Sequence, residues 1–139
     1  MAEVIVRSAG NLKQDISVGQ HSLVADEPGE AGGRDQGPGP YELLLAALGA
    51  CTSMTLELYA KRKDWPLDRV EVRLNQSRIY AKDCEECETT EGKITLIERR
   101  ISLIGDLSEE QRERLLAIAQ RCPVHQTLTS EISIRDSLE

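Results

Sequence analysis

The side chains with the widest chemical scope in this chain are four cysteines, Cys51, Cys84, Cys87 and Cys122. An ionised thiol is a nucleophile and a metal ligand, and it can be oxidised stepwise or paired into a disulfide. We expect a cytoplasmic protein, in which structural disulfides are rare. The four thiols are therefore interpreted as catalytic, metal-binding or simply buried.

Cys51 follows an apolar run and lies in a predicted helix. Its neighbours on the same helical face, three, four and seven residues away, are Leu44, Ala47, Leu48, Met54, Thr55 and Leu58. One interpretation is a small buried hydrophobic side chain. The other is a reactive thiol, which needs a nearby cation because burial alone raises the pKa of a thiol.

Cys122 immediately precedes Pro123, and Arg121 and His125 flank it. Proline suits a helix start, so Cys122 could occupy the capping position, where the positive end of a helix stabilises a thiolate. The alternative is structural. Cys122 also completes an apolar stripe with Leu115, Ile118 and Ala119 at helical spacing.

Cys84 and Cys87 form a CxxC pair within the acidic segment DCEECE. This spacing suits one half of a zinc site, but the only histidines are His21 and His125, and nothing in the sequence brings either one close. The adjacent glutamates disfavour thiolate formation. Three interpretations stay open: a weak metal site, an exposed dithiol or disulfide, and no special role.

The first half of the chain predicts strands followed by one long helix. Alternating apolar residues and glycine turns predict three short antiparallel strands within residues 4–24. The Gly- and Pro-rich segment Pro28–Pro40 predicts a loop. A helix then begins at Pro40 or Tyr41 and ends at the basic residues 61–63. Because its start is apolar nearly all round, we expect this helix to be buried at the centre of the fold.

The second half mixes strands and helices. In order, the patterns predict a strand at 70–75, an acidic loop at 82–92, a strand at 94–104 with a bulge near Glu98, and a closing strand with Ile132 and Ile134 turned inward. A capping box at residues 108–111 opens a helix that stops near Cys122, and a short helix restarts at Pro123. The fold class is α+β, in one domain spanning residues 1–139.

Composition limits the partners of this chain. The net charge of −7 disfavours nucleic acid and anionic membrane surfaces. Residues Met1–Gly10 lack a signal-peptide pattern, and the apolar run Leu43–Ala50 is too short to span a bilayer. With no Phe and few other aromatics the core is modest, so a dimer interface would add useful burial.

Two segments carry a resemblance to a known family. GPGPYELLLAALGACTSMTL and GDLSEEQRERLLAIAQRCPVHQTLTSEI resemble the OsmC/Ohr family, and the resemblance extends over essentially the whole chain. It is strongest to the subgroup whose helix begins with a PYELL-type start.

The resemblance implies an OsmC-like α+β subunit, with antiparallel sheets around a buried central helix, in an intertwined homodimer with sites at the interface. It also implies thiol-dependent reduction of hydroperoxides, often organic ones, without a cofactor. By position, Cys51 corresponds to the peroxidatic cysteine and Cys122 to the resolving one, which together form a disulfide. An external dithiol, lipoyl-type or thioredoxin-like, would reset the pair.

The sequence departs from the family where the activating cation is expected. Family peroxidases carry an Arg on an early strand and a Glu ten residues before the reactive cysteine, whereas here Asn11 and Tyr41 stand at those places. Glu42 lies nine residues before Cys51, roughly on the opposite side of a regular helix, so it is either a support for the site or only a first-turn acid. For the cation, Arg34 is the first candidate, with Arg121 and Arg7 weaker ones; for each the default is a surface position.

Three functions stay open on the sequence. The first is a two-cysteine hydroperoxide reductase. The second is a non-catalytic or weakly redox-active module of the same fold that binds a small hydrophobic ligand at the dimer interface. The third is a metal-binding accessory protein that uses Cys84 and Cys87.

Overall fold

The computed structural model describes all residues, Met1–Glu139, and they form two compact units. The N-terminal unit comprises Met1–Ala46 and the C-terminal unit Ala47–Glu139. The long helix α1 (Pro40–Lys63) contributes residues to both units.

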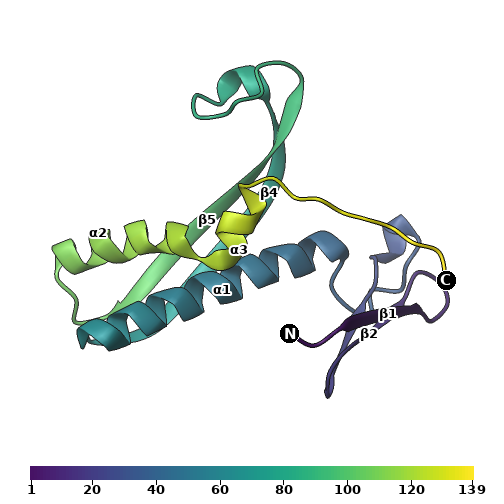
Figure 1. Ribbon diagram of the computed structural model, residues 1–139, viewed down its shortest axis with the longest axis horizontal. Coiled ribbons are helices and arrows are strands. Elements are labelled where there is room, and N and C mark those ends of the chain that lie inside the picture. The colour runs from purple at the N-terminus through teal and green to yellow at the C-terminus, as the bar shows by residue number, and fades with distance from the viewer. The chain divides into compact units, whose positions relative to one another are not determined.

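Three antiparallel strands form the sheet of the N-terminal unit. They are β1 (Val4–Ser8), β2 (Gln14–Val18) and β3 (His21–Ala25), in the order β1-β2-β3 (Figure 1). Val6 pairs with Ile16, and Ile16 pairs with Leu23 on the other side. The prediction of three short strands in residues 4–24 is confirmed.

Asp26 organises the segment between β3 and α1. Its side chain is buried, and its carboxylate accepts hydrogen bonds from the backbone N–H groups of Glu27 (2.8 Å), Arg34 (3.3 Å) and Gln36 (3.1 Å). Burial alone would raise the pKa of this carboxyl, but these bonds and the Arg34 charge outweigh it and hold the pKa below its ordinary value. Gly33 is required here, because a Cβ would lie 2.0 Å from the Glu27 carbonyl oxygen. The predicted loop therefore has a defined conformation, with a short 3-10 turn at Gly29–Ala31.

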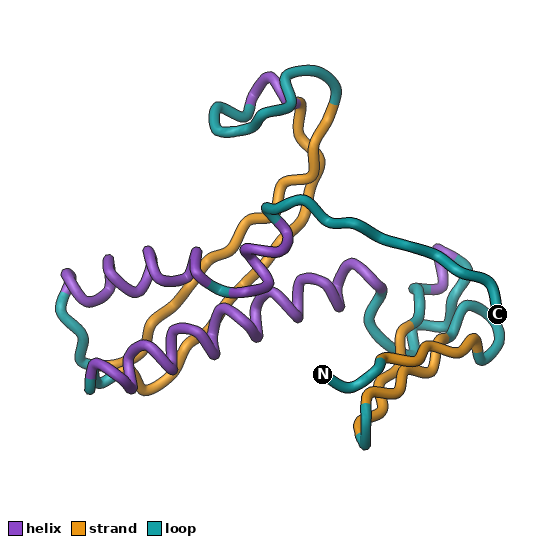
Figure 2. Tube along the Cα trace, viewed as in Figure 1, coloured by secondary structure: helices purple, strands orange, loops and turns teal.

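The C-terminal unit packs helices against a long β-hairpin. Its elements after α1 are β4 (Leu67–Tyr80), η2 (Ala81–Asp83), β5 (Lys93–Gly105), α2 (Glu109–Ile118), η3 (Ala119–Arg121) and α3 (Pro123–Leu128) (Figure 2). β4 and β5 pair antiparallel. The core joins Leu56 of α1 to Leu115 and Ile118 of α2. The half-buried Ile101 and Leu103 of β5 pack against this cluster.

The starts of α2 and α3 lie where local sequence signals predict them. Ser108 Oγ accepts the Gln111 N–H (3.1 Å) and Gln111 Oε1 accepts the Ser108 N–H (2.9 Å), which confirms the capping box. The predicted stripe on this helix is buried, including Leu115 and Cys122. A helix does restart at Pro123.

Two strand predictions are wrong. The β4–β5 pairing continues through Asn75 and Glu98, so there is no bulge near Glu98, and the one register shift lies between Leu67 and Arg69. Residues 131–139 form no strand, and Ile132 and Ile134 are exposed rather than turned inward. A strand needs a hydrogen-bonded neighbour, and the alternating pattern of this segment finds none within the single chain.

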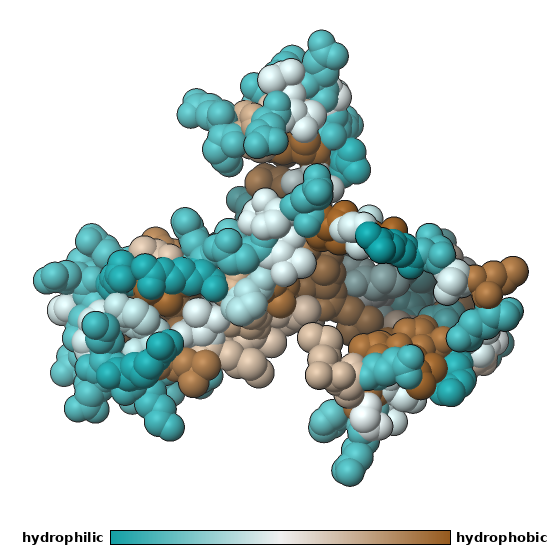
Figure 3. All heavy atoms as spheres, viewed as in Figure 1, coloured by the Kyte–Doolittle hydropathy of each residue, from teal (hydrophilic) through white to brown (hydrophobic).

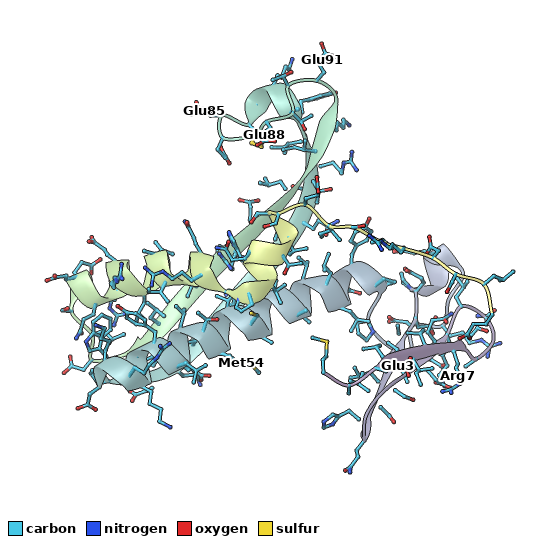
Figure 4. All side chains as sticks on the ribbon, viewed as in Figure 1. Glu3, Arg7, Met54, Glu85, Glu88 and Glu91 are labelled. Atoms are coloured by element: carbon cyan, nitrogen blue, oxygen red, sulfur yellow. A yellow bond between two sulfur atoms is a disulfide. The ribbon has the colours of Figure 1, made fainter.

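Helix α1 is buried along one stripe rather than all round, which corrects the predicted burial. Leu48, Thr52, Leu56 and Ala60 are buried at four-residue spacing. On another face Met54 is 61% exposed, and it points away from α2 and α3 (Figure 4). Figure 3 shows hydrophobic atoms exposed along this edge of α1. The single chain therefore leaves an apolar face of its central helix uncovered.

By length and composition α1 is also long and apolar enough to cross a membrane. The prediction of a segment too short to span a bilayer concerned only the uninterrupted apolar run Leu43–Ala50, whereas the whole helix has 24 residues. The core helix of a globular protein passes the same test, so this property does not distinguish the two.

Candidate active site

Cys51 and Cys122 lie side by side in the C-terminal unit. Both are free thiols, and they lie close enough for each to shift the pKa of the other. Cys51 Sγ accepts the backbone N–H of Val124 (3.5 Å), and Cys122 Sγ accepts that of His125 (3.5 Å). Cys51 is half-buried, whereas Cys122 is 0% exposed. The fold thus brings together two thiols that are far apart in the sequence.

Backbone features on both sides position this pair. Pro123 begins α3 directly after Cys122, which aims the His125 N–H at the Cys122 sulfur. On the opposite side Gly49 lets α1 approach β4, because a Cβ there would lie 2.9 Å from Leu74 Cδ1. The close approach brings this turn of α1, including Thr52, against the hairpin.

Arg99 of β5 supplies a cation beside the thiol pair. Its Nη1 donates to Thr52 Oγ1 (2.9 Å), and its Nη2 lies 3.1 Å from Nδ1 of His125. Since a guanidinium can only donate, His125 Nδ1 is the acceptor and the ring is neutral with its proton on Nε2. Thr52 is buried and donates its own hydroxyl to the Leu48 carbonyl (2.6 Å).

Sequence reasoning missed Arg99 and Thr52. Their contact spans 47 positions along the chain, and no spacing rule connects them. One signal was available: Arg99 shares its strand parity with Ile97, Ile101 and Leu103, the inward positions of β5. A charged side chain in an apolar register is a candidate for a functional role because burying a charge is costly.

The surroundings shift the pKa values of the two thiols in opposite directions. Burial opposes ionisation of Cys122, but the neighbouring Cys51 thiol and the N–H groups of His125 and Val124 outweigh it and hold the pKa of Cys122 below its ordinary value. For Cys51, burial and the hydrogen bond to Cys122 raise the pKa. A negative charge on Cys122 would therefore oppose ionisation of Cys51. Burial, followed by the Arg99 charge, lowers the pKa of His125, which keeps the ring neutral.

The other supporting residues named from the sequence have local contacts or exposed positions. Glu42 Oε1 accepts the Gly39 N–H (2.9 Å) at the start of α1, the position of a first-turn acid, and the neighbouring Tyr41 is exposed. Arg34 is exposed in the N-terminal unit, and Arg121 is exposed at the end of η3. Their contribution to the thiol pair stays a prediction, as does that of Arg7 in β1.

Cys84 and Cys87 form a disulfide in the loop between β4 and β5. The ligand atoms of Cys84, Glu86 and Cys87 lie within 4.8 Å of one another, so the reduced loop could offer three ligands to a metal ion. Further glutamates surround the pair at the end of the hairpin (Figure 4). A disulfide cannot ligate a metal as thiolate does. A metal site here stays a prediction.

A cavity of about 740 Å³ lies beside the site within the C-terminal unit. Arg99 and His125 line it, the Cys84–Cys87 loop borders it as well, and neither Cys51 nor Cys122 is among its lining residues. Most of the remaining lining is apolar, contributed by Leu48, Ile94, Leu96, Ile97, Ile101, Leu116 and Leu128. The cavity can accept an apolar molecule whose polar end faces the guanidinium.

Two adjacent thiols with a nearby cation can be oxidised in two successive steps. One thiol can be oxidised to a sulfenic acid, and the second can condense with it to a disulfide. The supply of hydrogen bonds to one sulfur favours its ionised and reactive form. The placement of Cys51 and Cys122 is compatible with this chemistry.

Known structures share this fold. An OsmC-like protein from Mycoplasma pneumoniae is 21% identical with a TM-score of 0.73, over 92% of this chain and 86% of that one. An organic hydroperoxide resistance protein from Legionella pneumophila is 21% identical with a TM-score of 0.67, over 93% and 89%. One from Vibrio cholerae with captopril bound in an active site is 17% identical with a TM-score of 0.63, over 93% and 85%.

The family follows from the sequence match. The model of the OsmC-like protein family matches residues 32–135, which include both cysteines of the site. The chain belongs to the OsmC-like family, and the expected family and α+β fold with antiparallel sheets are confirmed. No curated protein matches the chain.

Proposed function

We propose that this protein reduces organic hydroperoxides through a Cys51 sulfenic acid and a Cys51–Cys122 disulfide. The observation that carries the proposal is the pair of free thiols, one on α1 and one at the start of α3, whose sulfurs accept the consecutive backbone N–H groups of Val124 and His125. Membership of a family whose structural relatives include organic hydroperoxide resistance proteins supports it.

Exposure favours distinct roles for the two sulfurs. Cys51 is half-buried, so a hydroperoxide can reach it, whereas Cys122 is enclosed. In the proposed reaction Cys51 attacks the O–O bond, becomes a sulfenic acid and releases an alcohol. Cys122 then displaces hydroxide from the Cys51 sulfur and forms the disulfide, for which the two Cα atoms must lie about 4.4–6.8 Å apart.

The cavity favours an organic substrate over hydrogen peroxide. Its aliphatic lining would lose favourable contacts if only a small polar molecule occupied it, and it is large enough for a chain or ring. The reduced state would be restored by an external dithiol, lipoyl-type or thioredoxin-like.

We infer that the working unit is a homodimer in the cytoplasm. The exposed apolar face of α1, which includes Met54 and Leu58, needs a cover, and a second copy of the chain offers a matching surface. Nucleic acid remains an unsuitable partner for a chain with a net charge of −7. Membrane association is not part of the proposal.

Peroxide consumption by reduced protein tests the proposed function. We expect cumene hydroperoxide to be consumed by the wild type with a dithiol present, and consumption to be abolished in Cys51→Ser. Cys122→Ser should complete one turnover and stall at the sulfenic acid. Equal residual activity in both variants would contradict the assigned roles.

The second candidate is a module of the same fold that binds a small hydrophobic ligand without turnover. The large cavity favours it, as does the Vibrio cholerae relative with captopril in an active site. Saturable binding of an apolar probe, together with thiols that persist after peroxide is added, would favour this candidate over the peroxidase.

A further inference from the structure

The disulfide between Cys84 and Cys87 contributes little to the stability of the fold. It joins residues at a sequence separation of 3, and the stabilisation that a disulfide gives through the unfolded chain grows with the length of the ring it closes. Both cysteines are half-buried in the loop between β4 and β5, so a reductant can reach them. The pair is therefore better suited to a reversible change of state than to holding the chain together.

The loop that carries this pair has a concentrated negative charge. Residues 81–92 include five acidic side chains and one basic residue, Lys82 (Figure 4). The Lys82 Nζ atom lies 5.6 Å from the centre of the Tyr80 ring, and Lys82 forms no ion pair with the acids. Acidic neighbours disfavour a free thiolate, whereas a bound cation reverses this effect and deprotonates a coordinating thiol outright. The charge of the reduced loop thus favours a bound cation.

We propose that Cys84, Glu86 and Cys87 form a zinc-binding site when the disulfide is reduced. The two sulfur atoms and a carboxylate oxygen lie within 4.8 Å of one another, and the Cα atoms of the two cysteines are 5.5 Å apart. Thiolates about 2.3 Å from a tetrahedral Zn²⁺ lie about 3.8 Å from each other, a separation that these side chains can reach once the S–S bond is broken. This site goes beyond the proposed peroxide reduction and does not depend on it.

The types of ligand atom select the metal. Two thiolate sulfurs and one carboxylate oxygen suit Zn²⁺, which accepts both kinds of ligand. Mg²⁺ and Ca²⁺ prefer sites built from oxygen alone, so the two cysteines disfavour them. The site is therefore assigned to Zn²⁺ rather than to the alkaline-earth cations that an acidic loop without cysteines would attract.

Backbone hydrogen bonds hold the loop at its base. The Ala81 N–H donates to the Gly92 carbonyl (2.8 Å), which joins the two ends of the loop. The Cys84 N–H donates to the Ala81 carbonyl (3.0 Å) and closes η2. Ala81 itself is buried. A loop fixed in this way loses less conformational entropy when its side chains converge on one ion.

Three protein ligands leave a fourth position on a tetrahedral ion. Cys84, Glu86 and Cys87 all line the cavity of about 740 Å³, so water can reach the ion from that cavity. Structural zinc sites are closed by four protein ligands, whereas sites with three keep a position for water. Water therefore takes the fourth position here, and the bound zinc is exchangeable.

The change of state balances with an external dithiol as the reductant. The dithiol transfers two electrons and two protons to the Cys84–Cys87 disulfide and becomes a disulfide itself. Zn²⁺ then displaces the two thiol protons, which pass to water, and two Zn–S bonds form. Because a disulfide has no thiolate to offer, zinc binding is confined to the reduced loop.

Zinc uptake by the full chain tests the site. The protein is reduced with a phosphine, freed of metal and titrated with Zn²⁺ against a chromophoric chelator. We expect the wild type and Cys51→Ser to bind one zinc per chain, and the Cys84→Ser, Cys87→Ser double variant to bind none. Oxidised wild type, which has the same sequence, should also bind none. Equal uptake by reduced wild type and the double variant, or no uptake by either, would overturn the inference and leave the proposed function intact.

A matched pair of variants separates ligation by Glu86 from the charge of the loop. Glu85 and Glu86 are both exposed, but only Glu86 belongs to the ligand cluster. Even partners outside the ligand shell contribute about 10–100-fold to metal affinity, so Glu86→Gln should weaken zinc binding about 10-fold or more. Glu85→Gln removes the same charge and should weaken it by less than about 3-fold. Equal weakening in both variants would overturn the assignment of Glu86.

Cobalt gives a spectroscopic signature of the same ligands. Co²⁺ added to reduced wild type should show thiolate charge-transfer absorption and the intense visible bands of a tetrahedral ion. Both features should be absent from the Cys84→Ser, Cys87→Ser variant and retained in Cys51→Ser. Their loss in Cys51→Ser instead would place the metal at the other thiol pair and overturn the inference.

Discussion

Oxidation of the thiol pair should stabilise the C-terminal unit by an amount that follows from its position in the chain. A Cys51–Cys122 bond would close a loop of about 70 residues, for which chain-entropy arguments give a gain of about 4 kcal/mol at 25 °C. The two thiols are already neighbours in the reduced protein, so little native strain should reduce this gain. We therefore expect the free energy of unfolding to rise by about 2–4 kcal/mol on oxidation.

Urea unfolding followed by fluorescence measures this difference. Trp65 is the only tryptophan, and its ring lies 5.6 Å from that of Tyr59 in the C-terminal unit, so its emission reports on that unit. The protein carries Cys84→Ser and Cys87→Ser and is compared before and after one equivalent of cumene hydroperoxide. Cys51→Ser is the control and should show no gain. A mapped Cys51–Cys122 bond with a gain below about 1 kcal/mol would refute the geometric reasoning.

Three further predictions concern the fold. Leu115→Ala should lower the free energy of unfolding by about 2–5 kcal/mol in urea melts, since this side chain is 0% exposed. Substitution of its exposed neighbour, Leu116→Ala, should change the free energy of unfolding by only about 0.5 kcal/mol. Similar losses in both variants would contradict the packing. Ser108→Ala should cost about 0.5–2 kcal/mol in the same assay through loss of the capping box, and an unchanged midpoint would disprove its role. Asp26 has a lowered pKa in the folded protein, so its carboxyl binds a proton less tightly there than in the unfolded chain. The stability that it contributes should be complete above the ordinary carboxyl pKa and should be lost as the pH falls through the lowered pKa. Asp26→Asn should flatten this dependence in melts between neutral and acid pH.

Local patterns in the sequence were sufficient for most of the fold. Glycine turns and alternation gave the three N-terminal strands, Pro40 gave the start of α1, and the capping box gave the start of α2. The closing strand at Ile132 and Ile134 failed because alternation reports only that a segment can pair, while pairing depends on a neighbouring strand. The prediction that α1 is buried all round was wrong for a related reason. An apolar helix indicates that some surface packs against it, but not that the same chain provides that surface.

The site could be predicted only where the sequence marks it locally. The Cys122-Pro123 step predicted a capped sulfur, and the resemblance paired Cys122 with Cys51. The cation was not predictable from motifs, because Arg99 on β5 reaches Thr52 on α1 through space and the two residues are 47 positions apart in the chain. Its inward parity on β5 becomes informative only when the strand register is known.

The most direct test of the account is the disulfide that forms when reduced wild-type protein meets one equivalent of an organic hydroperoxide. Peptide mapping without reductant, after rapid acid quenching, should find Cys51 joined to Cys122 in proportion to the peroxide consumed. Consumption with both of these thiols still free, or with oxidation confined to Cys84 and Cys87, would contradict the central claim.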